Sequence, residues 1–147
     1  MPFKSNPEVG IDEYKIHIKV VGSATLELYK DVNHQIPLGP DPSFPVAQDS
    51  ACILKFYVDH NDWEFADPPI DWGGAGKPQH IHEHKISPDR KCLSILDLNH
   101  VRLELTQTEE TTSFTLQVQG VSNPSILLKK DPTIVDKGEQ GGNGWVR

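Results

Sequence analysis

The sequence predicts an all-β protein, built as an antiparallel β-sandwich of jelly-roll type with roughly eight strands. Apolar and polar residues alternate with a period of two over much of the chain, which is typical of strands with one buried face. Nowhere do apolar residues recur at helical spacing over three turns behind a capping residue. Turn-forming residues separate the alternating runs, so each run has the length of a strand.

The predicted strands follow one another along the chain. Residues 14–20 and 24–29 alternate on either side of Gly22-Ser23, which predicts a β-hairpin. Residues 52–58 are apolar on both faces, as expected of a central strand. Glu109-Glu110-Thr111 is predicted to form a hairpin tip between two of the later strands. Those further strands are predicted over residues 79–86, 91–96, 100–107, 113–119 and 125–129.

Two long segments interrupt this even spacing and are predicted to be loops. Residues 33–50 are rich in proline, and residues 59–78 combine prolines with tryptophans and glycines. Loops of this length are uncommon in a compact domain and are often functional. A chain of 147 residues is typical of one domain, which we expect over residues 1–136 with a glycine-rich tail over residues 137–147.

The charge balance bears on the choice of partner. The chain has 14 basic and 21 acidic side chains, a net charge of −7, which argues against a positive surface that would grip nucleic acid or an anionic membrane. No secretory signal and no apolar run of about 18–20 residues is present, so we expect a cytoplasmic protein. Cys52 and Cys92 are expected to be buried thiols in that compartment.

The segment His80-Ile81-His82-Glu83-His84 is the first candidate site. Strand alternation would place the three imidazoles of His80, His82 and His84 on one face, about 6.7 Å apart stepwise. Two neighbouring imidazoles and a third ligand could bind a transition metal such as zinc. That third ligand would be His100, Glu83 or Asp97.

The same segment resembles the opening of the cupin metal motif through Gly74, His80 and His82. Ile86 or Ser87 stands where that motif has a glutamate. One alternative function is therefore a metal-binding, cupin-like jelly roll. The competing interpretation is a polar outer strand face on which the imidazoles alternate with an inward Ile81.

The dipeptide Asp-Pro occurs three times, as Asp41-Pro42, Asp67-Pro68 and Asp131-Pro132. This bond is chemically weak because the aspartyl carboxyl can close onto its own carbonyl carbon as a cyclic anhydride, while proline leaves as a secondary amine. The first two lie in proline-rich segments, where Asp-Pro is an ordinary turn starter.

Asp131-Pro132 is set differently, between the strand-like runs 126–130 and 133–135. Proline inside a strand removes a ladder donor and belongs at an edge or bulge. Cleavage there would leave the tail paired in the sheet. Lys129 and Lys130 place positive charge beside the carboxylate, which favours its ionised form, and a lysine could intercept an anhydride as an isopeptide link. We therefore expect Asp131, Pro132 and Lys130 to form a catalytic group.

The chain resembles the Asp-Pro endopeptidase (DP-EP) family, which consists of small bacterial β-sandwich proteins that cleave themselves. The resemblance lies in the segment Lys129-Lys130-Asp131-Pro132-Thr133-Ile134-Val135. The resemblance covers size, all-β architecture and an Asp-Pro near the carboxyl terminus. It implies a hydrolase that cleaves its own Asp131-Pro132 bond, with its C-terminal segment as substrate. No cofactor is expected, self-association is left open, and no nucleic-acid or membrane partner is expected.

A third function is a non-catalytic binding module. Trp63, Trp72 and Tyr57 could stack on sugar faces while Asp62 and Asp71 bind hydroxyls. The favoured interpretation is that the two tryptophans cap the core beneath a long loop. No Ser-His-Asp, Walker or Rossmann motif points to another enzyme class.

Overall fold

The computed structural model describes residues 11–22, 25–39, 42–46, 51–74, 76–77, 81–98 and 109–137. This part of the chain forms strands and connecting turns, which confirms the all-β prediction. Its eleven strands are β1 Ile11–Val21, β2 Thr25–Tyr29, β3 Ser43–Val46, β4 Ala51–Val58, β5 Trp63–Asp71, β6 Ile81–Ile86, β7 Cys92–Leu98, β8 Glu109–Ser113, β9 Thr115–Gly120, β10 Leu127–Lys130 and β11 Thr133–Lys137.

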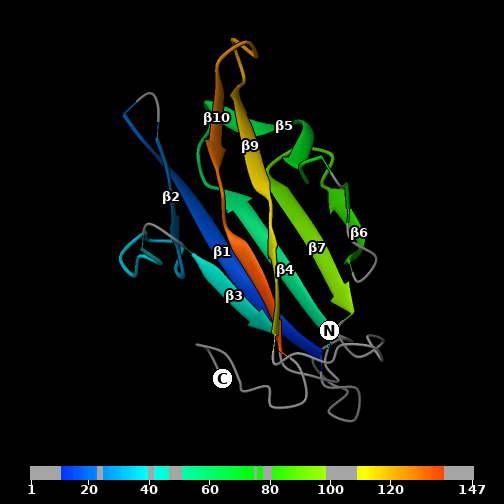
Figure 1. Cartoon of the computed structure of the whole chain (residues 1–147). Coiled ribbons are helices and arrows are strands. Elements are labelled where there is room, and N and C mark those ends of the chain that lie inside the picture. The colour runs from blue at the N-terminus through cyan, green and yellow to red at the C-terminus, as the bar shows by residue number, and fades with distance from the viewer. Residues whose placement is uncertain are drawn as a thin grey trace.

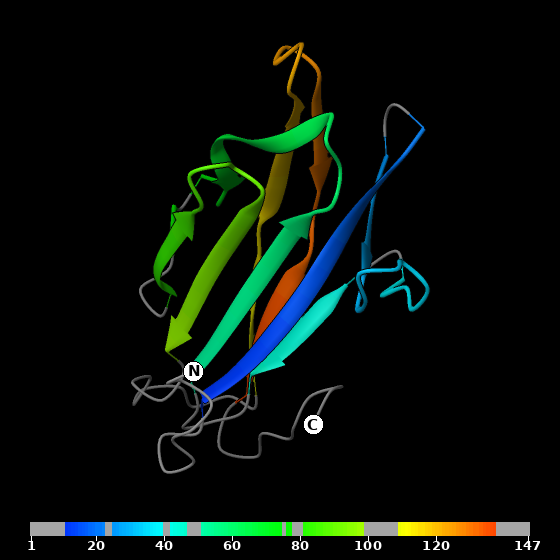
Figure 2. The same cartoon turned by 180° about the vertical axis from the view of Figure 1, so that it is seen from behind.

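The strands form three sheets arranged as a sandwich. One sheet has the order β2-β1-β4-β7-β6, and the others have the orders β10-β9-β5 and β3-β11-β8. The ribbon of β9 and β10 crosses one face of the five-stranded sheet, as both views show (Figures 1 and 2). Most pairs are antiparallel, as predicted, whereas β1 pairs with β4 and β3 with β11 in parallel. The sandwich is confirmed, with more strands than the sequence predicted.

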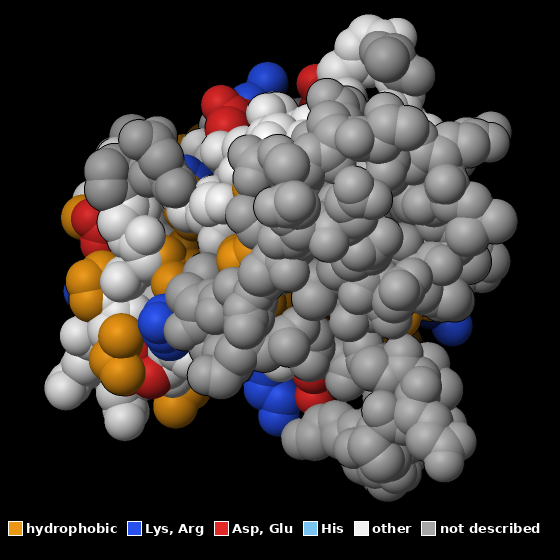
Figure 3. All heavy atoms as spheres, turned by 60° about the horizontal axis from the view of Figure 1, so that its bottom comes forward, with side chains coloured by type: hydrophobic (Ala, Val, Ile, Leu, Met, Phe, Trp, Pro, Cys, Tyr) orange, Lys and Arg blue, Asp and Glu red, His pale blue; other side chains and the backbone are white. Residues whose placement is uncertain are grey.

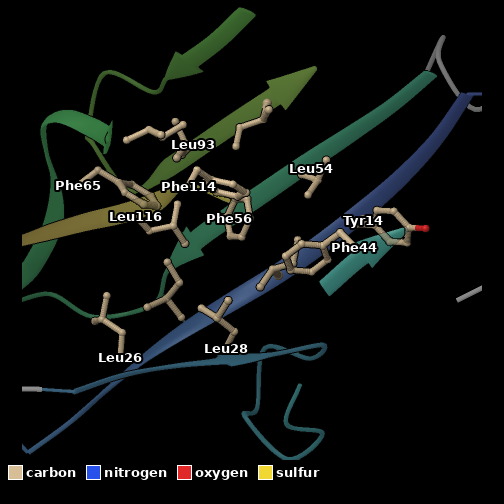
Figure 4. Close-up of a cluster of buried hydrophobic side chains, with 14 of the residues drawn as sticks. Tyr14, Leu26, Leu28, Phe44, Leu54, Phe56, Phe65, Leu93, Phe114 and Leu116 are labelled. Carbon is tan, nitrogen blue, oxygen red and sulfur yellow. The ribbon is translucent and has the colours of Figure 1, made fainter. Parts of the chain in front are cut away.

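The alternation of the first strands produces the buried face directly. Tyr14, Ile16 and Ile18 point inward from β1, and β1 pairs with β2 as the predicted hairpin. In β4 the first four residues are all buried, because this strand lies inside its sheet between β1 and β7. Figure 4 shows the resulting core, in which side chains from both layers interdigitate.

The two predicted loops each contain a strand. β3 lies within 33–50 and buries Phe44 and Val46, while β5 lies within 59–78 and buries Phe65 and Ile70. The register of β5 against β9 shifts between Phe65 and Ile70, where the prolines lie. Prolines are tolerated in such a bulge, so their presence did not exclude a strand. The loop prediction for both segments is therefore wrong in part.

The hairpin tip predicted over 109–111 is also wrong, because Glu109–Ser113 is strand β8 and pairs with β11 in a continuous register. The strand predicted over 100–107 lies outside the described residues. The remaining predicted strands correspond to β6, β7, β9 and β10 with shifted ends. β11 reaches Lys137, and residues 138–147 of the predicted tail lie outside the described ranges.

Among the described residues there is no helix with the length and apolarity needed to cross a bilayer. On the face seen in Figure 3, the described side chains mix hydrophobic, basic and acidic groups rather than forming one basic patch. Cys52 and Cys92 form no disulfide, and Cys52 is buried while Cys92 is half-buried.

Candidate functional site

Asp131-Pro132 lies where one long hairpin passes from one sheet to another. β10 ends at Lys130 and β11 begins at Thr133, while the opposing strand breaks at Phe114 between β8 and β9. The register runs from Lys130 opposite Leu116 to Thr133 opposite Ser113, so no residue is inserted on either side. The proline thus stands at a junction between two sheets, and not at the edge or bulge that the sequence suggested.

Two main-chain hydrogen bonds hold the junction on its carboxyl side. The N–H of Phe114 donates to the carbonyl of Pro132 at 3.3 Å, and the N–H of Thr133 donates to the carbonyl of Pro42 at 3.0 Å. Pro132 is buried, and the Phe114 ring reaches into the core against Phe56, as Figure 4 shows. The core therefore fixes the position of the peptide that follows Asp131.

The side chain of Asp131 is exposed and points into a shallow pocket of about 460 Å³. The hydroxyl of Thr115 donates a hydrogen bond to Asp131 Oδ1 at 2.7 Å. The pocket is lined by Asp71, Trp72, Gly73, Ser113, Phe114, Thr115 and Asp131.

Asp131, Thr115 and Asp71 form a row across three neighbouring chain segments. Asp71 on β5 lies opposite Thr115 on β9, and Asp131 directly follows the pair formed by Lys130 and Leu116. Leu116 is fully buried, so its neighbour Thr115 faces outward, as do the two aspartates. Since neighbouring strands are about 4.8 Å apart, the Cα atoms of Asp71 and Asp131 are about 10 Å apart. Two carboxyl groups thus flank one hydroxyl.

Lys130 lies on the opposite face of the junction from Asp131. Its side chain lines a different pocket, of about 520 Å³, together with β2 residues and Pro37 and Gly39. The alternation along the chain explains this, because successive side chains point to opposite faces. The structure therefore does not bring Lys130 into the pocket that holds the Asp131 carboxylate.

Trp72 forms the aromatic wall of the Asp131 pocket. Its ring centroid lies 5.5 Å from that of Phe114 and 6.3 Å from that of His84. Trp72 Nε1 and His84 Nδ1 are buried, and neither has a hydrogen-bond partner within the described part of the chain. Burial, followed by the nearby charge of Lys77, lowers the pKa of His84 below its usual value. His84 is therefore a neutral imidazole behind the pocket wall at neutral pH.

The predicted row of three imidazoles on one strand face is wrong. The pairing of β6 with β7 goes from Ile81–Asp97 to Glu83–Leu96, so His82 is an extra residue at a bulge. A bulge reverses the phase of alternation, and His84 therefore shares the face of Ile81 instead of opposing it. The ring of His84 accordingly packs inward against Trp72.

Most of the other members of the predicted metal site lie outside what the structure describes. His80, His100 and the side chains of His82 and Glu83 lie outside what the structure describes, and Asp97 is buried. Among the described side chains, no three histidines, cysteines or acids converge as a metal-ion site.

The two tryptophans pack against the core, as the favoured interpretation held. Trp63 begins β5 and Trp72 follows its last residue, so the indoles lie at opposite ends of a nine-residue strand. They do not form one sugar-stacking surface. Of the acids near Trp63, Glu64 accepts a hydrogen bond from Gln119 Nε2 at 2.8 Å.

The other two Asp-Pro dipeptides differ in setting. Asp67 and Pro68 are exposed within the irregular part of β5, and their peptide bond is cis. Asp41 lies outside the described residues, and Pro42 is buried beside β11. Asp131, in contrast, lines a pocket together with a second carboxyl group, that of Asp71.

Sequence reasoning missed a second cluster altogether. His17 Nδ1 lies 2.9 Å from Asp59 Oδ2, and His34 Nε2 lies 3.3 Å from the same oxygen. His34 has a φ of 56°, a conformation that residues other than glycine rarely adopt. The cluster ties the loop after β2 to β1 and to the end of β4. No local pattern predicts it, because its members come from three separate segments.

No family model and no curated protein matches this chain. What the fold and the pocket define is a β-sandwich domain with two carboxyl groups at the junction of two sheets. Its function is therefore inferred from the residues of that pocket.

Proposed function

We propose that the protein cleaves its own backbone between Asp131 and Pro132. The observation that carries this proposal is the position of the Asp131 carboxyl group, held by the Thr115 hydroxyl beside a core-anchored peptide. The likeness of residues 129–135 to the DP-EP family supports the same assignment. The proposal includes the cytoplasmic location expected from the sequence.

The reaction uses the carboxyl group of Asp131 as the nucleophile. Thr115 holds Oδ1, which leaves Oδ2 to attack the carbonyl carbon of Asp131 itself. The C–N bond to Pro132 breaks, the proline nitrogen takes up a proton, and Asp131 becomes a cyclic anhydride. One water molecule then opens the anhydride, so that the net reaction is hydrolysis of one peptide bond.

The fold would retain the product that begins at Pro132. β11 pairs with β3 on one side and β8 on the other, and Ile134 is fully buried. The C-terminal piece would thus remain a central strand of its sheet after the backbone is cut. Cleavage would not release a peptide under native conditions.

The direct test is the intact mass of the purified chain after incubation over a range of acid to neutral pH. The parent is expected to yield two masses that divide between Asp131 and Pro132, whereas Asp131→Asn is expected to cleave far more slowly at that position. Asp67→Asn is a matched control at an exposed Asp-Pro bond and should cleave at residue 131 like the parent. A parent chain that stays whole at every pH, or an equally fast Asp131→Asn variant, would overturn the proposal.

A further inference from the structure

We infer that Asp71 is the acid that protonates the departing Pro132 nitrogen and then accepts a proton from the water that opens the anhydride. This inference rests on the proposed self-cleavage. Asp131 cannot transfer these protons while it acts as the nucleophile. The inference assigns both proton transfers to the second carboxyl group of the pocket.

The geometry of the row supports this role. Asp71 and Asp131 line the same pocket from opposite sides of Thr115, about 10 Å apart at their Cα atoms. Both carboxyl groups therefore border the same open pocket, across which a water molecule would carry the proton between Asp71 and the Asp131–Pro132 bond.

One oxygen of Asp71 is already fixed by the local fold. The N–H of Gly73 donates to Asp71 Oδ1 at 2.9 Å, in a turn that directly follows β5. Gly73 has a φ of 87°, which glycine adopts without the strain of a side chain. The second oxygen of Asp71 remains for the pocket, where Trp72 and Phe114 supply an apolar wall.

The charged groups around Asp71 are few. From the segment after β10 the facing group is Asp131, whereas β8 and β9 contribute the neutral hydroxyls of Ser113 and Thr115. Behind Trp72 lie the imidazole of His84 and, near it, Lys77. Among the described residues that line the pocket none is basic, and Asp71 supplies the carboxyl group there other than Asp131.

The proton balance closes with water as the only other reactant. Protonated Asp71 gives its proton to the Pro132 nitrogen as the C–N bond breaks, and becomes a carboxylate. Water then adds to the anhydride carbonyl while Asp71 takes one of its protons. The Asp131 residue ends with two carboxyl groups, Pro132 ends as a free secondary amine, and Asp71 returns to its starting state.

The test compares cleavage rates and their pH profiles in the full-length parent, Asp71→Asn and Asp71→Glu. The asparagine keeps an oxygen for the Gly73 N–H but cannot donate a carboxyl proton. General acid–base groups typically contribute about a hundredfold or more, so Asp71→Asn should slow cleavage by about that factor. The shape of the parent's pH profile should change in Asp71→Asn, which has no carboxyl proton to give. Asp71→Glu should keep the parent's profile at a reduced rate.

Asp62→Asn serves as the control, because Asp62 is an exposed carboxyl group near the other end of β5. It should leave both the rate and the profile unchanged. If the parent does not cleave, the proposed function itself fails. If the parent cleaves and Asp71→Asn matches its rate and pH profile, the self-cleavage stands and the role of Asp71 is overturned.

Discussion

At the scale of single residues, the site depends on one hydroxyl. Thr115 donates to Asp131 Oδ1 and stands between the two carboxyl groups of the row. A hydrogen bond to a charged group contributes about 1.5–3 kcal/mol, which is enough to hold an exposed side chain in one rotamer. In the proposed reaction, Thr115 would therefore position the nucleophile without taking part in bond formation.

Thr115→Val removes this hydrogen bond while keeping the shape of the side chain. We expect cleavage to slow by about tenfold or more, since 1.4 kcal/mol corresponds to a factor of ten in rate. Thr115→Ser keeps the hydroxyl and should stay close to the parent. Time courses of intact mass would measure both rates. If Thr115→Val cleaves at the parental rate, Thr115 does not position the Asp131 carboxyl group for cleavage.

The burial of His84 makes the stability of the folded chain depend on pH. The folded chain disfavours the imidazolium, because burial and then Lys77 lower the pKa of His84. A group whose pKa is lower in the folded than in the unfolded chain binds its proton preferentially in the unfolded chain. The stability contributed by a neutral His84 is therefore fully present above about pH 6.5 and declines as pH falls below that value.

Thermal unfolding of the parent and of His84→Asn between pH 8 and pH 5 measures this effect. The parent should lose more stability than the variant as the pH falls below about 6.5. His60→Asn is the control, since His60 is exposed. If the stability of the parent and of His84→Asn falls equally with pH, His84 does not contribute to the pH dependence of stability.

At the scale of elements, β11 would hold the C-terminal piece in the fold after the proposed cleavage. It lies between β3 and β8 and buries Ile134 completely. The chain approaches it from β10 through two residues that belong to neither strand. Cutting that link removes no ladder hydrogen bond of β11, because the bonds on its side of the cut start at the Pro132 carbonyl, which stays with β11.

The two cleavage products should therefore co-elute in native size-exclusion chromatography and separate only in denaturant. Ile134→Ala should weaken retention, because truncation of a fully buried isoleucine costs about 2–5 kcal/mol. Val135→Ala alters a half-buried side chain of the same strand and should affect retention less. Release of the C-terminal fragment from the cleaved parent in native buffer would contradict this picture.

The strands also show which parts of the fold could be predicted from sequence patterns. Period-two alternation predicted β1, β2 and β9, each of which buries one face, whereas a run that is apolar on both faces predicted β4, which lies inside its sheet. It failed for β3 and β5, where prolines occupy positions that a bulge or an edge tolerates. Glu109-Glu110-Thr111 resembled a turn by composition, yet its pairing with β11 is a long-range effect that no local pattern encodes.

The candidate site was predictable only in part for a similar reason. Asp131 and Pro132 stood out through their chemistry, but the approach of Asp71 and Thr115 depends on the register of β5 with β9. The predicted histidine row failed because a single bulge residue at His82 changes the face of every following side chain.

At the scale of the whole molecule, the sandwich holds the junction rigid through its core. Phe56 on β4 lies against Phe114 at 6.3 Å and Phe44 at 5.8 Å between ring centroids, which connects the large sheet to β3 and to the junction between the two smaller sheets. Phe114 in turn holds the carbonyl of Pro132. The packing of the two layers thus reaches the Asp131–Pro132 junction through one aromatic contact.

Phe56→Ala should destabilise the protein by about 3–5 kcal/mol, as expected for a fully buried phenylalanine. Val32→Ala truncates a side chain that is 58% exposed and should change stability little. Urea unfolding followed by tryptophan fluorescence measures both values. A loss below about 1 kcal/mol for Phe56→Ala would contradict this description of the core.

The central claim is that the fold, and not the bare dipeptide, makes the Asp131–Pro132 bond reactive. The most direct measurement compares cleavage at the three Asp-Pro bonds of one chain, Asp41–Pro42, Asp67–Pro68 and Asp131–Pro132, in native buffer and in strong urea at the same pH. We predict that cleavage in native buffer is confined to Asp131–Pro132, and that its advantage over the other two bonds disappears when the chain is unfolded. Equal cleavage of the three bonds in the native chain, or faster cleavage at residue 131 in urea, would contradict the account.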